Sequence, residues 1–134
     1  MRVSIFGLGY VGAVSAACLA KEGHTVIGVD VDPHKLDLIR QGKAPIVEAN
    51  LEPYLQQAVQ SGRLTVTDDP TEAVHRTEIS LLCVGTPSKE NGDLRTDYLE
   101  RVARQIGEAL ITKQAYHIVV IRSTILPGTA EEVV

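Results

Sequence analysis

The feature that most restricts how this chain can fold is the spacing of three glycines close to its first residue. The run VSIF, residues 3–6, has the composition of a β-strand, and Gly7, Gly9 and Gly12 follow it directly. The spacing G-x-G-x-x-G between a strand and a helix is typical of a dinucleotide-binding turn. The first glycine allows a sharp turn, the second leaves room for a pyrophosphate, and the third lets the helix pack closely.

The residues around this turn decide whether it binds a ligand, because three glycines alone are also compatible with an ordinary tight turn. Tyr10 and Val11 open the predicted helix, so their free amides would face the phosphates. Asp30 ends the next predicted strand, 18 residues beyond Gly12. An acidic side chain at that position accepts hydrogen bonds from the adenosine ribose. The alternative is that Asp30 is a helix N-cap or a loop residue.

The charges that follow the second strand favour NAD over NADP. Asp30 and Asp32 would both repel a 2′-phosphate, and no arginine follows Asp30 directly. Lys35 lies in the first turn of the next predicted helix, from which it would reach the ribose or a phosphate, or else lie on a solvated helix face. His34 is interpreted as a surface residue.

Strands and helices alternate along the whole chain. This alternation predicts a single α/β domain of Rossmann type, with a parallel sheet, right-handed crossovers and helices on both faces. The expected strand order is 3-2-1-4-5, with the usual sixth strand either missing or beyond these residues. The predicted strands cover residues 3–6, 25–30, 64–67, 78–84 and 117–124. The predicted helices cover residues 10–22, 32–42, 52–60, 68–76 and 98–111, and another begins near 126.

The hydrophobic pattern also predicts which residues are buried. Val11, Val14 and Cys18 recur at helical spacing and are expected to face the sheet. Residues 78–84 form the most hydrophobic strand and are expected at the sheet centre. Cys18 and Cys83 both lie in apolar segments, so we expect buried thiols in a reducing cytoplasm.

Composition and charge exclude several classes of protein. The net charge of −4 and the absence of any run of Lys or Arg argue against a nucleic-acid backbone or an anionic membrane as a partner. No segment of 18 apolar residues is present, and the N-terminus does not resemble a signal peptide. The cysteine spacing fits no metal motif. We therefore expect a cytoplasmic protein without a bound metal.

A second candidate site segment follows the fourth predicted strand. In the sequence VGTP, residues 84–87, Gly85 would allow a close backbone approach, and Thr86 would offer a hydroxyl and an amide to the cofactor. Pro87 marks a turn at the same place. An ordinary Gly-Thr-Pro turn is the alternative.

A third segment, RSTILPG at residues 122–128, follows the fifth predicted strand. Carboxyl ends of parallel strands are where such folds bind ligands. Thr124 would there hydrogen-bond a cofactor ribose, a substrate group or a water molecule, or else cap a helix. Arg122 is either functional or part of a structural ion pair.

Several motifs together resemble one family. They are IFGLGYVG, GVDVDPHKLDLIRQG, EPYLQQAVQSGRL, VGTPSKENGDLRTDYL and RSTILPGT, and the similarity covers essentially all of the chain. The sequence resembles the N-terminal NAD-binding domain of the UDP-glucose/GDP-mannose dehydrogenases. This resemblance implies cofactor contacts from Tyr10, Val11, Asp30, Lys35, Thr86 and Thr124. It also places Thr124 near the catalytic water.

The resemblance further implies an activity. Family members oxidise the primary alcohol of a nucleotide sugar to a carboxylate with two NAD, through a thioester on a cysteine. The implied substrate is GDP-mannose, for an exopolysaccharide such as alginate, with UDP-glucose or UDP-N-acetylmannosamine as alternatives. Neither Cys18 nor Cys83 matches the family nucleophile. We therefore expect an N-terminal portion of an enzyme roughly three times longer, homodimeric or larger when complete, whose helical and substrate domains lie elsewhere.

Three other classes of protein share parts of this pattern. A regulatory module that binds NAD without catalysis would have the same fold. A 3-hydroxyacid dehydrogenase shares the first βαβ unit, but the Tyr10–Val11 pair and the threonine-proline loop followed by Gly92 argue against it. The strict glycine spacing before a long helix is less compatible with an S-adenosylmethionine-dependent enzyme.

Overall fold

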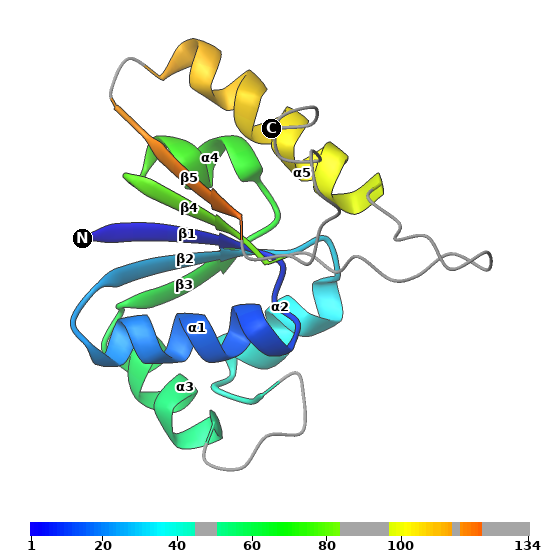
Figure 1. Ribbon diagram of the computed structural model, residues 1–134. Coiled ribbons are helices and arrows are strands. Elements are labelled where there is room, and N and C mark those ends of the chain that lie inside the picture. The colour runs from blue at the N-terminus through cyan, green and yellow to red at the C-terminus, as the bar shows by residue number, and fades with distance from the viewer. Residues whose placement is uncertain (45–50, 84–96, 114–115, 122–134) are drawn as a thin grey trace.

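The computed structural model describes residues 1–44, 51–83, 97–113 and 116–121 of the chain. All five strands of its sheet are parallel, in the order β3-β2-β1-β4-β5, which confirms the predicted fold and strand order (Figure 1). The strands are β1 (Arg2–Phe6), β2 (Thr25–Val29), β3 (Leu64–Thr67), β4 (Ile79–Leu82) and β5 (Ile118–Ile121). The helices are α1 (Tyr10–Lys21), α2 (Pro33–Arg40), α3 (Leu51–Gln60), α4 (Pro70–His75) and α5 (Asp97–Thr112).

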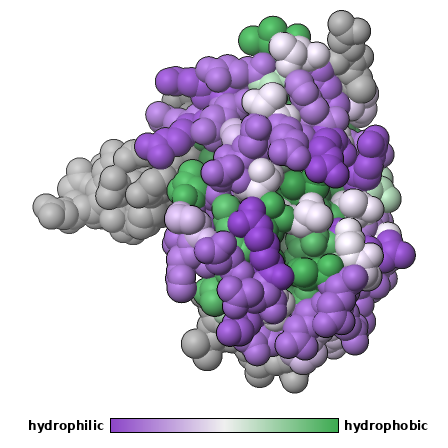
Figure 2. Space-filling view, turned by 180° about the vertical axis from the view of Figure 1, so that it is seen from behind, coloured by the Kyte–Doolittle hydropathy of each residue, from purple (hydrophilic) through white to green (hydrophobic). Residues whose placement is uncertain are grey.

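The helices cover the two faces of the sheet in separate groups. Helices α1, α2 and α3 enclose one hydrophobic core with alternate residues of β1, β2 and β3. Helices α4 and α5 enclose a second core on the opposite face, against β1, β2 and β4 (Figure 1). From behind, hydrophilic residues surround a smaller hydrophobic area (Figure 2). The sheet is thus the middle layer of three.

The centre of the sheet is β1, so the expectation that residues 78–84 form the central strand was wrong. Strand β1 pairs with β2 on one side and with β4 on the other, and its last four residues are all buried. In β4, buried residues alternate with half-buried Ile79 and Leu81. Hydrophobicity alone misplaced the strand, because burial depends on how many neighbours and helices cover it.

The packed face of α1 also differs from the prediction. The residues that point into the core are alanines: Ala13, Ala16, Ala17 and Ala20. By contrast, Val11 is 41% exposed, Val14 is half-buried, and the thiol-bearing Cys18 is exposed. Cys83 is half-buried, so neither cysteine is the buried thiol expected. Alanine methyl groups suit this face because α1 lies close to the backbone of the turn at Gly7.

Two aspartates begin helices. Asp32 is the N-cap of α2 and accepts a hydrogen bond from the His34 N–H at 2.9 Å. Asp69 is the N-cap of α4 and accepts from the N–H of Thr71 and of Glu72. Each cap satisfies helix amides that have no partner within the helix.

Buried hydroxyl groups join β1 to β4 inside the second core. The Oγ atoms of Ser4 and Ser80 lie 2.6 Å apart, and both residues are fully buried. Thr77, which is also buried, donates to the Ala73 carbonyl at 2.8 Å. Ser80 Oγ is in turn 2.7 Å from His117 Nε2. None of the described buried side-chain polar atoms lacks a partner, so this polar core is fully satisfied.

The imidazole of His117 ends this network beside an ammonium group. Lys113 Nζ lies 2.8 Å from His117 Nδ1 and also donates to the carbonyls of Val74 and Thr77. Because an ammonium can only donate, Nδ1 accepts and Nε2 carries the proton that is donated to Ser80. Burial, and then the charge of Lys113, lower the pKa of His117 below its ordinary 6.5. The fold therefore favours neutral His117.

This preference makes stability depend on pH. Between the lowered folded pKa of His117 and its ordinary pKa of 6.5, the unfolded chain binds a proton at this residue that the folded chain does not. The free energy of unfolding should therefore decrease as the pH is lowered through this range. This group contributes at most about 1.4 kcal/mol per pH unit to the decrease. We expect His117→Gln, which does not titrate, to flatten the dependence measured by urea denaturation. His34→Gln, on the exposed start of α2, is the control and should keep the wild-type slope. An unchanged slope in His117→Gln would contradict the assignment.

Candidate functional site

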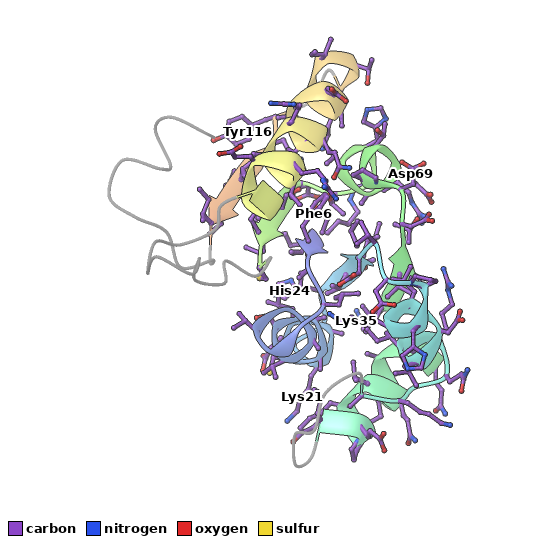
Figure 3. All side chains as sticks on the ribbon, turned by 90° about the vertical axis from the view of Figure 1, so that its right-hand side faces the viewer. Phe6, Lys21, His24, Lys35, Asp69 and Tyr116 are labelled. Carbon is purple, nitrogen blue, oxygen red and sulfur yellow. The ribbon has the colours of Figure 1, made fainter. Side chains whose placement is uncertain are left out.

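The candidate site lies at the edge of the sheet where the parallel strands end, which faces the viewer in Figure 3. Strand β1 ends at Phe6, and Gly7 turns the chain with a φ of 97°, in the left-handed region that favours glycine. Helix α1 begins three residues later, with Gly9 as its N-cap. The glycine turn, residues 7–12, therefore connects the central strand to the helix beneath it.

Space around the other two glycines differs sharply. A Cβ atom added at Gly12 would lie 1.7 Å from the Gly7 carbonyl oxygen, a distance that no side chain can occupy. Among the residues that the structure describes, a Cβ atom added at Gly9 would have no neighbour within 4 Å. The close approach at Gly12 brings α1 as near to the turn as backbone atoms permit. The open position at Gly9 leaves space at the helix N-terminus, where a ligand can approach the backbone.

The start of α1 fits an anionic group. The first amides of a helix have no partner within it and carry the positive end of the helix dipole. Gly9 provides no side-chain cap, and the first turn contains no acidic residue. The amides of Tyr10 and Val11 therefore lie at the positive end of a helix whose cap and first turn supply no acidic side chain. This arrangement suits a diphosphate, as predicted for these residues.

Asp30 follows β2 directly, and both of its carboxylate oxygens accept backbone hydrogen bonds. The Leu8 N–H donates to Oδ2 and the Asp32 N–H donates to Oδ1, each at 2.9 Å. The Asp30 side chain is 10% exposed. The carboxylate thus connects the end of β2 to the glycine turn and to the start of α2. The N-cap of α2 is Asp32, not Asp30.

A carboxylate offers about four lone-pair sites, and these two amides use two of them. Asp30 therefore retains the capacity to accept from the two hydroxyls of a ribose. Its ribose role remains a prediction, while its structural role was not foreseen from the sequence. The sequence did contain a signal for the Asp32 contact. Aspartate side chains often accept from the amide two residues further along, and Asp30 precedes Asp32 by two residues.

Lys35 is neither fully solvated nor free. Its Nζ lies 4.0 Å from Asp30 Oδ2, and its side chain is 34% exposed. Figure 3 shows Lys35 at this edge, between α1 and α2. A partly exposed pair of this length contributes at most about 1 kcal/mol to stability. Lys35 therefore balances part of the negative charge of Asp30 and Asp32 where a ribose would lie.

Two further residues of this site were missed in the sequence. Leu8, between the first two glycines, is fully buried. A Cβ atom added at Gly28, in β2, would lie 3.0 and 3.1 Å from the two Leu8 Cδ atoms. A glycine inside a strand often marks a close approach by another group, and that signal was present in the sequence TVIGVD.

The remaining predicted site residues lie outside the part of the chain that the structure describes. They are Gly85, Thr86, Pro87, Arg122 and Thr124. The described chain does reach the site from β4, because the Cys83 N–H donates to the Phe6 carbonyl at 2.8 Å. The Cys83 Cβ lies 3.5 Å from the position of a Cβ added at Gly12. The end of β4 therefore lies beside the glycine turn.

Two other features are absent from the described ranges. Residues 1–44, 51–83, 97–113 and 116–121 contain no group of three or more His, Cys, Asp or Glu side chains arranged to hold a metal ion. Within the same ranges, no helix combines the length and hydropathy needed to cross a membrane.

Comparison with known proteins agrees with this geometry. Residues 1–134 match the NAD binding domain of the UDP-glucose/GDP-mannose dehydrogenase family. The chain is 60% identical to GDP-mannose 6-dehydrogenase from Azotobacter vinelandii, across 100% of this chain and 31% of that protein. It is 39% identical to UDP-glucose 6-dehydrogenase from Rhizobium meliloti, across 99% of this chain and 30% of that protein. The chain thus spans under a third of the length of these relatives.

Solved structures give the same result. A ternary complex of GDP-mannose dehydrogenase from Pseudomonas aeruginosa matches with a TM-score of 0.98 and 59% identity, across 99% of this chain and 30% of that one. A UDP-glucose dehydrogenase from the archaeon Pyrobaculum islandicum matches with a TM-score of 0.91 and 41% identity, across 96% of this chain and 30% of that one.

Substitution of Asp30 tests both its predicted role in ribose binding and its structural role, with Asp37 as a control carboxylate. Asp30→Ala removes the predicted ribose acceptor and leaves the Leu8 and Asp32 amides without a partner. We expect NAD affinity to fall at least about tenfold and the free energy of unfolding to fall by about 1–3 kcal/mol. Calorimetry and urea denaturation measure the two effects. Asp37→Ala, on the exposed side of α2, should change neither appreciably. Wild-type NAD affinity in Asp30→Ala would remove Asp30 from the binding site.

Proposed function

Because the chain belongs to the UDP-glucose/GDP-mannose dehydrogenase family as its NAD binding domain, we propose that it supplies the coenzyme site of a GDP-mannose 6-dehydrogenase. The observation that carries this proposal is the open helix start beside Gly9, flanked by the anchored carboxylate of Asp30. One feature suits the diphosphate of NAD and the other suits its adenosine ribose. The bound coenzyme would accept hydride from the sugar alcohol.

The choice of GDP-mannose is supported by the relatives. Proteins named GDP-mannose 6-dehydrogenase are 56–60% identical to the chain, whereas those named UDP-glucose 6-dehydrogenase are 39–40% identical. The described residues offer support for the coenzyme site rather than for a sugar site. The proposed substrate therefore depends on this difference in identity, with a UDP-sugar as the alternative.

The proposed reaction needs groups that the described chain does not offer. Oxidation of a primary alcohol to a carboxylate removes four electrons as two hydrides, so two NAD are reduced, and water supplies the second oxygen. A cysteine that holds the intermediate must lie near the nicotinamide. Cys18 lies eight residues along α1, about 12 Å from its start, and Cys83 is half-buried at the end of β4. We propose that the nucleophile comes from outside this chain.

An exposed face of β5 is consistent with a longer protein. Ile118 and Val120 are 40% and 39% exposed, although they belong to a strand of four apolar residues. Their neighbours Val119 and Ile121 point to the opposite face and pack on the second core. We propose that other parts of the full-length enzyme cover Ile118 and Val120.

The isolated chain should bind coenzyme without catalysing the reaction. We expect the 134-residue chain to bind NADH, detected by a change in nicotinamide fluorescence. It should produce no NADH when mixed with GDP-mannose and NAD, because the nucleophile is absent. Steady NADH production by the pure chain, abolished by Asp30→Ala, would contradict the proposed location of the nucleophile.

A domain exchange tests the proposed substrate. We expect a chimera to oxidise GDP-mannose when this chain replaces the matching part of the Pseudomonas aeruginosa GDP-mannose 6-dehydrogenase, which is 60% identical to it. The chimera should form two NADH per GDP-mannose. The same chimera with Asp30→Ala should show a higher KM for NAD, whereas Asp37→Ala should behave as the parent chimera. A folded chimera that binds NAD but cannot oxidise GDP-mannose would count against this function.

A further inference from the structure

We propose that Leu8 and Gly28 are positioning residues for the coenzyme diphosphate. The Leu8 side chain occupies the space that Gly28 leaves open in β2, and this contact sets the height of the glycine turn above the sheet. The inference rests on the proposed coenzyme binding, because the diphosphate is the group that the turn would hold.

The contact is tight enough to control position. A Cβ atom added at Gly28 would lie 3.0 and 3.1 Å from the Leu8 Cδ atoms and 3.2 Å from Val66 Cγ1. Distances in this range are shorter than ordinary van der Waals contact, so one neighbour would have to move. Leu8 is fully buried in the first core and has little empty space around it into which to move. Gly28 is therefore a packing partner of the turn rather than a conformational requirement of the strand.

Three successive residues, the last two of β2 and Asp30 after it, hold the glycine turn. Gly28 provides the space for the Leu8 side chain, and the Val29 carbonyl accepts from the Gly7 N–H at 2.9 Å. The Asp30 carboxylate accepts from the Leu8 N–H, also at 2.9 Å. Leu8 is thus fixed through both its amide and its side chain. The two hydrogen bonds fix the direction of the turn, and the side-chain contact fixes its separation from the sheet.

This separation matters for the ligand. The amides at the start of α1 follow Leu8 after a single residue, so a displacement of Leu8 moves them together with the Gly9 backbone. Hydrogen bonds to an anion weaken steeply when distance or angle departs from the optimum. Small displacements of positioning groups have large effects on binding and rate. Val66 lies on β3, and its movement does not require the turn to move.

The test uses pairs of substitutions in the 134-residue chain, with NAD affinity measured by calorimetry and stability by urea denaturation. Gly28→Ala adds a methyl group against Leu8, and we expect NAD affinity to fall about tenfold. In the double variant Gly28→Ala with Leu8→Val, both Cδ atoms of Leu8 are gone, and most of the NAD affinity should return. In the double variant Gly28→Ala with Val66→Ala, the contact with β3 is relieved instead, so any stability lost through Gly28→Ala should return but NAD affinity should not.

Matched controls separate position from stability. Val66→Ala alone should lower stability and leave NAD affinity unchanged. Gly107→Ala, on α5, adds a methyl group that has no neighbour within 4 Å in the described part of the chain, so it should not weaken binding. Leu8→Ala removes the anchor without adding volume, so it provides a second measurement if Gly28→Ala does not fold. We expect it to weaken NAD binding as well.

The outcomes distinguish this inference from the proposed function. If Gly28→Ala or Leu8→Ala binds NAD as the wild type does, while Asp30→Ala loses binding, the positioning role is wrong and the coenzyme site stands. Rescue of affinity by Val66→Ala but not by Leu8→Val would also overturn the positioning role. If the folded wild-type chain does not bind NAD at all, the proposed function fails and this inference fails with it.

Discussion

The contact between Gly12 and the carbonyl of Gly7 is the constraint on which the rest of the structure depends. Because a Cβ at Gly12 would lie 1.7 Å from that oxygen, α1 approaches the turn as closely as backbone atoms allow. Large side chains cannot fit beneath a helix held this close, which accounts for the row of alanines on its packed face. The same approach aims the positive end of α1 at the open space beside Gly9.

The carboxylate of Asp30 adds an electrostatic constraint to this steric one. Its two oxygens accept from Leu8 and Asp32, so the turn, the end of β2 and the start of α2 share one charged group. Hydrogen bonds to a charged acceptor are roughly twice as strong as neutral ones, so the carboxylate stiffens the site before any ligand arrives. Lys35 offsets part of its charge. A residue that a family resemblance assigns to the ribose thus also builds the site.

The two edges of the sheet have different chemistry. The carboxyl edge has an open helix start and a carboxylate with unused acceptor sites. Near the opposite edge, where β4 and β5 begin, Ser80, His117 and Lys113 form a continuous and fully paired network. Buried polar groups at the second location cost free energy unless each finds its partner, so the network fixes how β4, β5 and α5 meet. Ligand binding and structural specificity are therefore located in different parts of the domain.

The sequence by itself determined the order of elements, the sheet topology and the residues that form the glycine turn. Spacing sufficed for these features because they depend on backbone conformation, on a missing Cβ and on the handedness of crossovers. Tertiary structure alone decided which face of α1 is buried. Small and apolar residues occur all around that helix, so the helical spacing of Val11, Val14 and Cys18 did not identify the packed side. Tertiary structure also decided that Asp30 accepts from the Leu8 N–H and that the Leu8 side chain packs against Gly28. These two contacts join residues about 20 positions apart, and their distances depend on how closely the helix and the strands pack.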